Sequence, residues 1–153
     1  MWRIMRAAHL ADAWTGEGAR LFGGRWNSRG VRIVYTATSL ALAAMEFFVN
    51  LEPNRRPHDL VRLRADIAEG IAVGAVDPHG LAANWNAARD ESLRVIGDAW
   101  VAANATVALR VPSAAVDGEW NVLLNPAHAD WPRIALHEPA PFTYDARMFR
   151  SSG

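Results

Sequence analysis

The chain has 153 residues, of which 51% are apolar and 21% are charged, and its formal net charge is zero. This length and composition predict a single folded domain over residues 1–153 and exclude an intrinsically disordered chain. The balanced charge gives no electrostatic reason for binding nucleic acid or a membrane surface. No apolar run reaches the roughly 18 residues needed to span a bilayer.

All sixteen basic residues are arginine, and cysteine is absent. The lack of lysine excludes a Schiff-base nucleophile, so any phosphate must be bound by arginine or by backbone amides. The lack of cysteine excludes thiol catalysis, disulfides and thiolate metal sites. The histidines are scattered and form no HExxH motif, so we predict no metal site. The N-terminus has no apolar segment typical of a secretion signal, and we therefore expect a cytoplasmic protein.

The first half of the chain contains a glycine-rich segment followed by three expected elements. The segment GEGARLFGGRWNSRG, residues 16–30, is typical of a loop, because glycine weakens helices and strands. The β-branched residues of 31–38 predict a buried strand. A helix is expected over 39–52 with Ser39 as its N-cap. Residues 59–66 alternate apolar side chains with arginine, as in a half-exposed strand.

The second half alternates short elements with irregular segments. Residues 67–80 are interrupted by glycine and are expected to be irregular. Apolar side chains at helical spacing predict a helix over 90–104. Strands are expected within 105–114 and 119–128, and two more short strands around a proline-rich turn within 132–149. The sum is a mixed α+β fold, since the order of elements is too irregular for repeated βαβ units.

Glu46 is the only charged residue from Ser39 to Leu51. On a narrow polar stripe of the helix it would stay ionised at little cost. In a buried position its charge would cost several kcal/mol unless it were paired or reserved for a ligand. Both interpretations are open from the residues alone.

Arg25 and Ser113 are two further candidates with ordinary alternatives. Arg25 lies in the glycine-rich segment, where the backbone can approach a ligand closely and a guanidinium suits a phosphate pair. It equally suits a surface turn in which the arginine stacks on Trp26. Ser113 follows a strand end, where serine commonly forms a turn, and no GxSxG motif surrounds it. Tyr35 is by default a core residue whose hydroxyl is hydrogen-bonded.

In combination these segments resemble the RES-domain family, the toxin halves of bacterial toxin–antitoxin pairs. The resemblance covers nearly the whole chain and rests on the motifs WRI, GGRWN, VYTATSLALAAME, VPSA followed by EWNVLLNPAH, and FTYDARMF. The arginine, glutamate and serine that give the family its name match Arg25, Glu46 and Ser113. Residues 66–88 match nothing in the family pattern that we can place.

The resemblance implies an ADP-ribosyltransferase-like fold, in which a split β-sheet with flanking helices holds NAD+ in its cleft. It implies cleavage of the nicotinamide–ribose bond of NAD+, the substrate, without a metal. It also implies that a partner antitoxin with a helix-turn-helix domain of the Xre type covers the active site.

The implied roles fit the chemistry of the residues. Glu46 would stabilise the oxocarbenium-like ribose that forms when the N-glycosidic bond breaks. Arg25, and Arg3 in the WRI motif, would bind the pyrophosphate. Tyr35 would stack on the nicotinamide or support Glu46, and Ser113 would orient Glu46 or the ribose hydroxyls. Lesser candidates for polar contacts are Asn27 and Asn121.

The sequence does not identify the acceptor of the ADP-ribose. Transfer to water or phosphate would make the chain an NAD+ glycohydrolase or phosphorylase and a growth-arresting toxin. Transfer to a cellular protein would make it a protein ADP-ribosyltransferase. A module that binds without turnover is a third reading, which the carboxylate of Glu46 disfavours.

Overall fold

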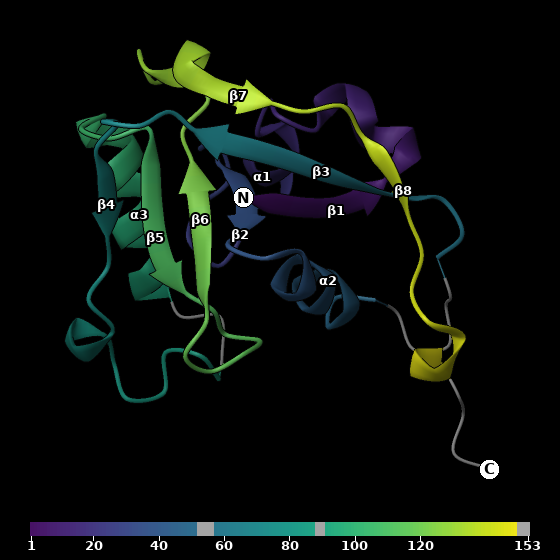
Figure 1. Ribbon diagram of the computed structural model, residues 1–153. Helices are drawn as coiled ribbons and strands as arrows, with labels where there is room; N and C mark the ends of the chain where they lie inside the picture. The colour runs from purple at the N-terminus through teal and green to yellow at the C-terminus, as the bar shows by residue number, and fades with distance from the viewer. Residues whose placement is uncertain (52–56, 88–90, 150–153) are drawn as a thin grey trace.

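The computed structural model of the chain describes residues 1–51, 57–87 and 91–149. Its strands form one sheet in the order β4-β5-β6-β2-β1-β3-β7, with β8 also pairing with β3 (Figure 1). The strands are β1 (Trp2–Arg6), β2 (Val34–Ala37), β3 (Leu60–Ile67), β4 (Val73–Ala75), β5 (Ala108–Pro112), β6 (Trp120–Leu124), β7 (Ile134–Leu136) and β8 (Ala140–Phe142). The helices are α1 (Glu17–Phe22), α2 (Leu40–Phe48) and α3 (Glu91–Ala103), with short 3-10 helices η1 (Ala7–Asp12), η2 (Pro78–Gly80), η3 (Trp131–Arg133) and η4 (Ala146–Phe149).

The sheet splits between its two central strands, β1 and β2. The register of these strands pairs Trp2 with Ala37 alone. By contrast, β1 pairs with β3 along its whole length, from Trp2 to Arg6, and β2 pairs with β6 from Val34 to Ala37. The strands therefore meet at one end and diverge at the other, which opens a cleft in the middle of the sheet. The predicted α+β fold with a split sheet and flanking helices is confirmed.

Each part of the split sheet packs against its own helix. Helix α2 packs Leu42 and Ala43 against Ile4 of β1 in one apolar cluster. Helix α3 lies against β5 and β6 (Figure 1), where Leu93 packs with Leu123 in a second cluster. Burial of these apolar faces therefore gives each half of the sheet its own core, with the cleft between the two halves.

Most elements expected from the sequence are present, with shorter bounds. The expected strand over 31–38 is β2, and the expected helix over 39–52 is α2, which ends at Phe48. The helix expected over 90–104 is α3. Residues 52 and 90, the outer ends of two expected helices, lie outside the described residues. So do residues 150–153, and the expectation of one domain over the whole chain stays a prediction.

Besides the 3-10 helices, two strands and one α-helix of the described residues were not expected, and each is short. Strand β1 was not assigned, because its five residues WRIMR carry no clear alternation. Residues 16–30, expected to be a loop, contain the six-residue helix α1. Residues 67–80, expected to be irregular, contain β4, a three-residue edge strand parallel to β5.

The longest helix in the described parts of the chain, α3, has 13 residues and is too short to cross a membrane.

Candidate active site

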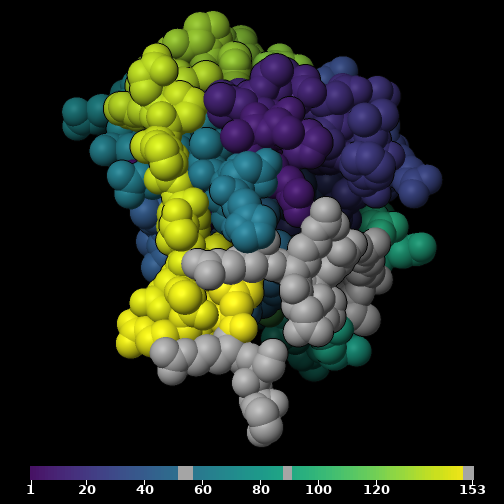
Figure 2. Space-filling model, turned by 90° about the vertical axis from the view of Figure 1, so that its right-hand side faces the viewer, coloured from purple at the N-terminus to yellow at the C-terminus, as the bar shows by residue number. Residues whose placement is uncertain are grey.

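Helix α2 carries Glu46 and is fixed at its start and along its side. The Ser39 hydroxyl accepts a hydrogen bond from the Leu42 amide at 3.0 Å, the N-cap expected from the sequence. From the C-terminal segment, the Tyr144 hydroxyl donates to the carbonyl of Ala44 at 2.5 Å. This segment, yellow in Figure 2, runs along the surface beside β3. The helix backbone that positions Glu46 is therefore fixed both by its own N-cap and by a residue 100 positions away from Ala44.

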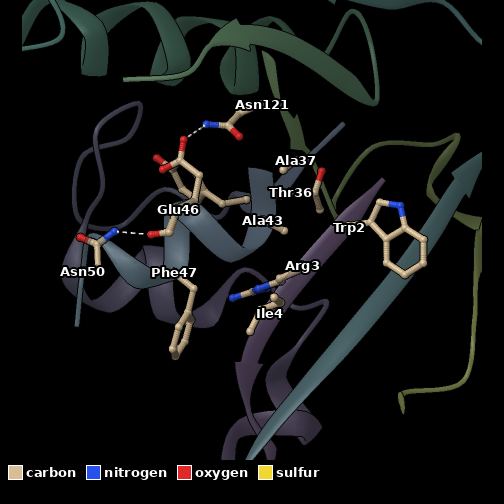
Figure 3. A pocket seen from close by; sticks show the side chains of 11 residues that line it. Trp2, Arg3, Ile4, Thr36, Ala37, Ala43, Glu46, Phe47, Asn50 and Asn121 are labelled. Atoms are coloured by element: carbon tan, nitrogen blue, oxygen red, sulfur yellow. Dashed lines mark hydrogen bonds between the residues drawn. The ribbon is translucent and has the colours of Figure 1, made fainter. Parts of the chain in front are cut away.

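The carboxylate of Glu46 is held by two side chains from the far half of the sheet. Its Oε1 accepts from the Ser113 hydroxyl at 2.7 Å and from the side-chain amide of Asn121 at 2.5 Å (Figure 3 shows Asn121). Among the described residues, no hydrogen bond reaches its other oxygen, Oε2. The carboxylate is therefore fixed through one oxygen while the second keeps its acceptor capacity.

Ser113 is itself fixed by the turn that follows β5. Its hydroxyl oxygen accepts from the backbone amides of Ala115 and Val116, both at 3.1 Å, while its hydrogen goes to Glu46. The residue is buried, with 4% of its surface exposed. Since all its hydrogen-bonding capacity is used within the protein, this geometry favours orientation of Glu46, one of the two roles predicted for Ser113.

Asn121 also uses only part of its hydrogen-bonding capacity. Its amide nitrogen binds Glu46, whereas its Oδ1 is withdrawn from solvent and has no partner among the described residues. A buried acceptor left unpaired in this way costs free energy, and native proteins contain only a few such groups.

The glycine-rich loop, residues 23–30, is shaped by Asn27. This side chain is fully buried and donates to the carbonyls of Ala19, Ser28 and Val31 at 2.9–3.0 Å. Its Oδ1 accepts from the Tyr35 hydroxyl at 2.7 Å. Asn27 thus uses its polar atoms to fold the loop, and its predicted contact with a ligand stays a prediction.

Tyr35 and Gly24 meet beneath this loop. The Tyr35 hydroxyl accepts from the Trp26 amide at 3.0 Å, and burial raises the pKa of this hydroxyl above its ordinary value. A Cβ at Gly24 would lie 2.5 Å from the same oxygen, so only glycine fits. The hydroxyl of Tyr35 supports the loop rather than Glu46, and the residue lines two cavities of the cleft.

Helix α3 holds the loop from outside. Asp98 accepts from the Ser28 amide at 3.0 Å, and Arg94 donates to the carbonyl of Gly24 at 3.2 Å. Between them lies Gly97, where a Cβ would be only 1.8 Å from the carbonyl oxygen of Trp26. Sequence reasoning missed these three residues, although a glycine inside an otherwise good helical pattern signals a close approach.

Arg25 extends from this loop into the cleft. Its guanidinium donates to the carbonyl of Trp85 at 3.1 Å, which ties it to the segment before α3. The residue lines the same cavity as Glu46, Arg3 and Tyr35. The structure therefore brings the predicted arginine and the predicted glutamate to one cavity, across the split in the sheet.

Three adjoining cavities follow the split, and we name them by position. The inner cavity, about 260 Å³, lies between β1, β2 and α2 and contains Glu46 and Asn121 (Figure 3). The loop cavity, about 750 Å³, extends from Glu46 to α1 and Arg25. The outer cavity, about 610 Å³, lies between β1, η1, α1 and Phe47 of α2.

Arg3 of β1 lines all three cavities. Its guanidinium donates to the carbonyl of Ala13, and burial lowers its pKa to about 10. In the described parts of the chain this guanidinium forms no ion pair, and a buried cation of this kind is costly and attracts an anionic ligand.

Five of the predicted site residues therefore line the cavities, and two support them. Those that line the cavities are Arg3, Arg25, Tyr35, Glu46 and Asn121. Ser113 and Asn27 lie behind them and fix Glu46 and the loop. The sequence did not indicate Asn50, which lines the inner and loop cavities and donates to the Glu46 carbonyl at 2.8 Å.

Comparison with known proteins identifies the family. A model of the RES domain matches residues 1–145. The chain is 35% identical over 156 residues to the Prs ADP-ribosylating toxin of a Sphingobium species, covering 99% of this chain and 97% of that protein. It is 34% identical over 153 residues to Toxin Res of Photorhabdus laumondii, covering 99% and 97%. This chain belongs to the RES-domain family, as the resemblance indicated.

A solved structure shows the same fold. The chain superposes on a chain of the M. tuberculosis MbcT–MbcA toxin–antitoxin complex with a TM-score of 0.72 at 21% sequence identity. The match covers 93% of this chain and 82% of that one. The fold expected from the sequence thus has a known counterpart in a toxin–antitoxin complex.

Proposed function

We propose that this chain is a toxin enzyme that cleaves the nicotinamide–ribose bond of NAD+ and so arrests growth. The observation that carries the proposal is the carboxylate of Glu46, fixed through Oε1 by Ser113 and Asn121 at a cavity lined by two arginines. The name of the Sphingobium relative supports it, because ADP-ribosylation takes its ADP-ribose from NAD+.

The reaction needs a negative charge beside the ribose. When the bond between C1′ and the nicotinamide nitrogen breaks, its electron pair leaves with nicotinamide, and positive charge develops on C1′ and the ring oxygen. A preorganised carboxylate stabilises this oxocarbenium-like state more strongly than water does. Glu46 suits this role because its hydrogen bonds are made before substrate arrives. The unpaired Oδ1 of Asn121 is suited to accept a hydrogen bond from the substrate beside it.

The pyrophosphate needs positive charge at a distance from Glu46. Arg3 and Arg25 supply it from β1 and from the glycine-rich loop, and both line the loop cavity with Glu46. Tyr35 lines both the inner and the loop cavity, which supports its assignment as the residue that contacts the nicotinamide.

Two classes of acceptor, a small molecule and a protein, are each supported by an observation. The loop cavity, about 750 Å³, offers room for water or phosphate beside the ribose, which would give a glycohydrolase or a phosphorylase. The name of the Sphingobium relative, an ADP-ribosylating toxin, favours transfer to a protein instead. The partner of the toxin would be an antitoxin of the Xre helix-turn-helix type that covers the cleft. The toxin–antitoxin complex with the same fold supports such a partner.

The products of the purified chain distinguish these activities. We expect NAD+ loss with release of nicotinamide, measured by mass spectrometry with and without phosphate. Free ADP-ribose identifies hydrolysis, and a phosphorylated product formed only with phosphate identifies phosphorolysis. Labelled protein in a cell extract, with NAD+ stable in its absence, identifies a protein acceptor. NAD+ that stays intact under all three conditions contradicts the proposal.

A further inference from the structure

Phe22 at the end of α1 is an exposed aromatic side chain that lines both the loop cavity and the outer cavity. It is 73% exposed, and its neighbour Leu21 is 48% exposed. Large apolar side chains gathered at the mouth of a polar cleft mark a binding surface more often than isolated ones do. The backbone turns away directly after Phe22, at Gly23 with φ of 70°, so the ring stands at the rim.

Phe22 shares the outer cavity with a second aromatic side chain. Phe47 of α2 lines the same cavity from the opposite helix. Among the described residues the two rings make no ring–ring contact, and about 610 Å³ of space lies in this cavity. A flat apolar ring placed there would be bordered by aromatic walls from α1 and α2.

The charged residues of the outer cavity differ from those of the inner cavity. Asp12 and Glu17 line it together with Arg3, Arg6 and His9, and Glu17 is paired with Arg20 and Arg32. The Asp12 carboxylate is an acceptor for an exocyclic amine. Arg3 lies where the three cavities adjoin, because it lines the outer cavity as well as the inner and loop cavities. The outer cavity is the one that Phe22 and Phe47 line together, since Phe22 also lines the loop cavity and Phe47 the inner cavity.

We propose that the outer cavity is the adenine subsite of the enzyme and that Phe22 is its stacking residue. This inference rests on the proposed function. With the nicotinamide–ribose bond at Glu46 and the pyrophosphate at Arg3, the adenosine half extends into the cavity between Phe22 and Phe47. Stacking on Phe22 makes the enzyme select dinucleotides over nicotinamide mononucleotide, which lacks the adenosine.

Two substrates and one nucleotide test the subsite in the purified full chain. For Phe22→Ala we expect the KM for NAD+ to rise about five- to 150-fold, the loss typical of one base–aromatic stack, with kcat changed less than twofold. The kinetic constants for nicotinamide mononucleotide stay unchanged. Phe22→Tyr, which keeps a ring, restores the KM for NAD+. Val95→Ala, at a 67% exposed apolar position on α3, leaves all constants unchanged.

Calorimetric titration with AMP tests the site without turnover. The wild-type chain and Val95→Ala bind AMP, and Phe22→Ala binds it at least fivefold more weakly. If the wild-type chain consumes no NAD+ but binds AMP through Phe22, the proposed function fails and the subsite stands. An unchanged AMP affinity in Phe22→Ala, or a KM that rises equally for both substrates, overturns the subsite. In that case the exposed ring of Phe22 is assigned to contact with a protein partner instead.

Discussion

The Ser113 hydroxyl donates a hydrogen bond to Oε1 of Glu46 at 2.7 Å, across the split that separates β1 from β2. Because the same hydroxyl accepts two backbone amides, its orientation is fixed by the turn after β5. Two residues 67 positions apart in the sequence are therefore joined into one unit. We expect mutations of this pair to lower the catalytic rate more strongly than they lower the stability of the fold.

The change Ser113→Ala tests this expectation. It removes the donor to Glu46 and the acceptor for two amides, so we expect a loss of about 1–3 kcal/mol in the free energy of unfolding. The kcat for NAD+ should fall by roughly tenfold or more, since a carboxylate that is no longer fixed stabilises the transition state less well. Ser39→Ala is the matched control, because it removes the N-cap of the same helix at a cost of about 1 kcal/mol without touching the carboxylate. Equal kcat values in the two variants would give Ser113 a purely structural role.

Arg3→Met is expected to weaken the binding of NAD+ and to raise the stability of the fold. Among the described residues the Arg3 guanidinium forms no ion pair with a carboxylate, so its replacement by an apolar side chain should raise the free energy of unfolding by about 1 kcal/mol. The KM for NAD+ should rise about tenfold through the lost contact with the pyrophosphate. Urea denaturation and steady-state kinetics measure the two effects. A variant that is clearly less stable, with an unaltered KM, would remove Arg3 from the binding site.

The pH dependence of NAD+ affinity follows from the same residue. Burial lowers the pKa of Arg3 to about 10, so its charge is present below this pH and is lost as the pH rises through it. The affinity for NAD+ should therefore fall above about pH 10, and Arg3→Met should abolish this fall. The folded state disfavours the charged form, so the cost to stability is present below about pH 10 and decreases at higher pH. Calorimetric titrations between pH 8 and 10.5, flanking that pKa, check the sign.

Gly97→Ala is expected to act on the loop through α3. A Cβ there would lie 1.8 Å from the Trp26 carbonyl oxygen, so the loop and Arg25 must shift. We expect a loss of about 1–3 kcal/mol in stability, the typical cost of overpacking, together with a raised KM for NAD+. Gly80→Ala serves as the control, since a Cβ at Gly80 meets nothing within 4 Å. A wild-type KM in Gly97→Ala would show that α3 does not position Arg25.

The sequence predicted the elements whose patterns are local. The N-cap at Ser39 and the apolar run of α2 fixed this helix, and β-branched residues indicated β2. The split of the sheet, by contrast, depends on β1 and β2 meeting only at Trp2 and Ala37. No local pattern encodes such a long-range register, and only the family resemblance supplied it.

The sequence predicted which residues belong to the candidate site but not which role each of them has. Glu46 is visible as a lone charge in an apolar helix, and Arg25 as an arginine among glycines. Whether Asn27 faces a ligand or folds the loop depends on its three carbonyl partners, which come from separate positions of the loop and of α1. The support from α3 was missed because Gly97, Arg94 and Asp98 act through backbone contacts with a segment about 70 residues earlier in the chain.

Nicotinamide release by Glu46→Gln is the most direct test of the proposed catalytic role. The amide is close in size to the carboxylate but cannot supply its negative charge, so we expect kcat to fall at least 100-fold with a KM near that of the wild-type chain. The exposed Glu69→Gln should release nicotinamide at the wild-type rate. Wild-type turnover and wild-type toxicity in Glu46→Gln would contradict the assignment of Glu46 as the residue that stabilises the ribose cation.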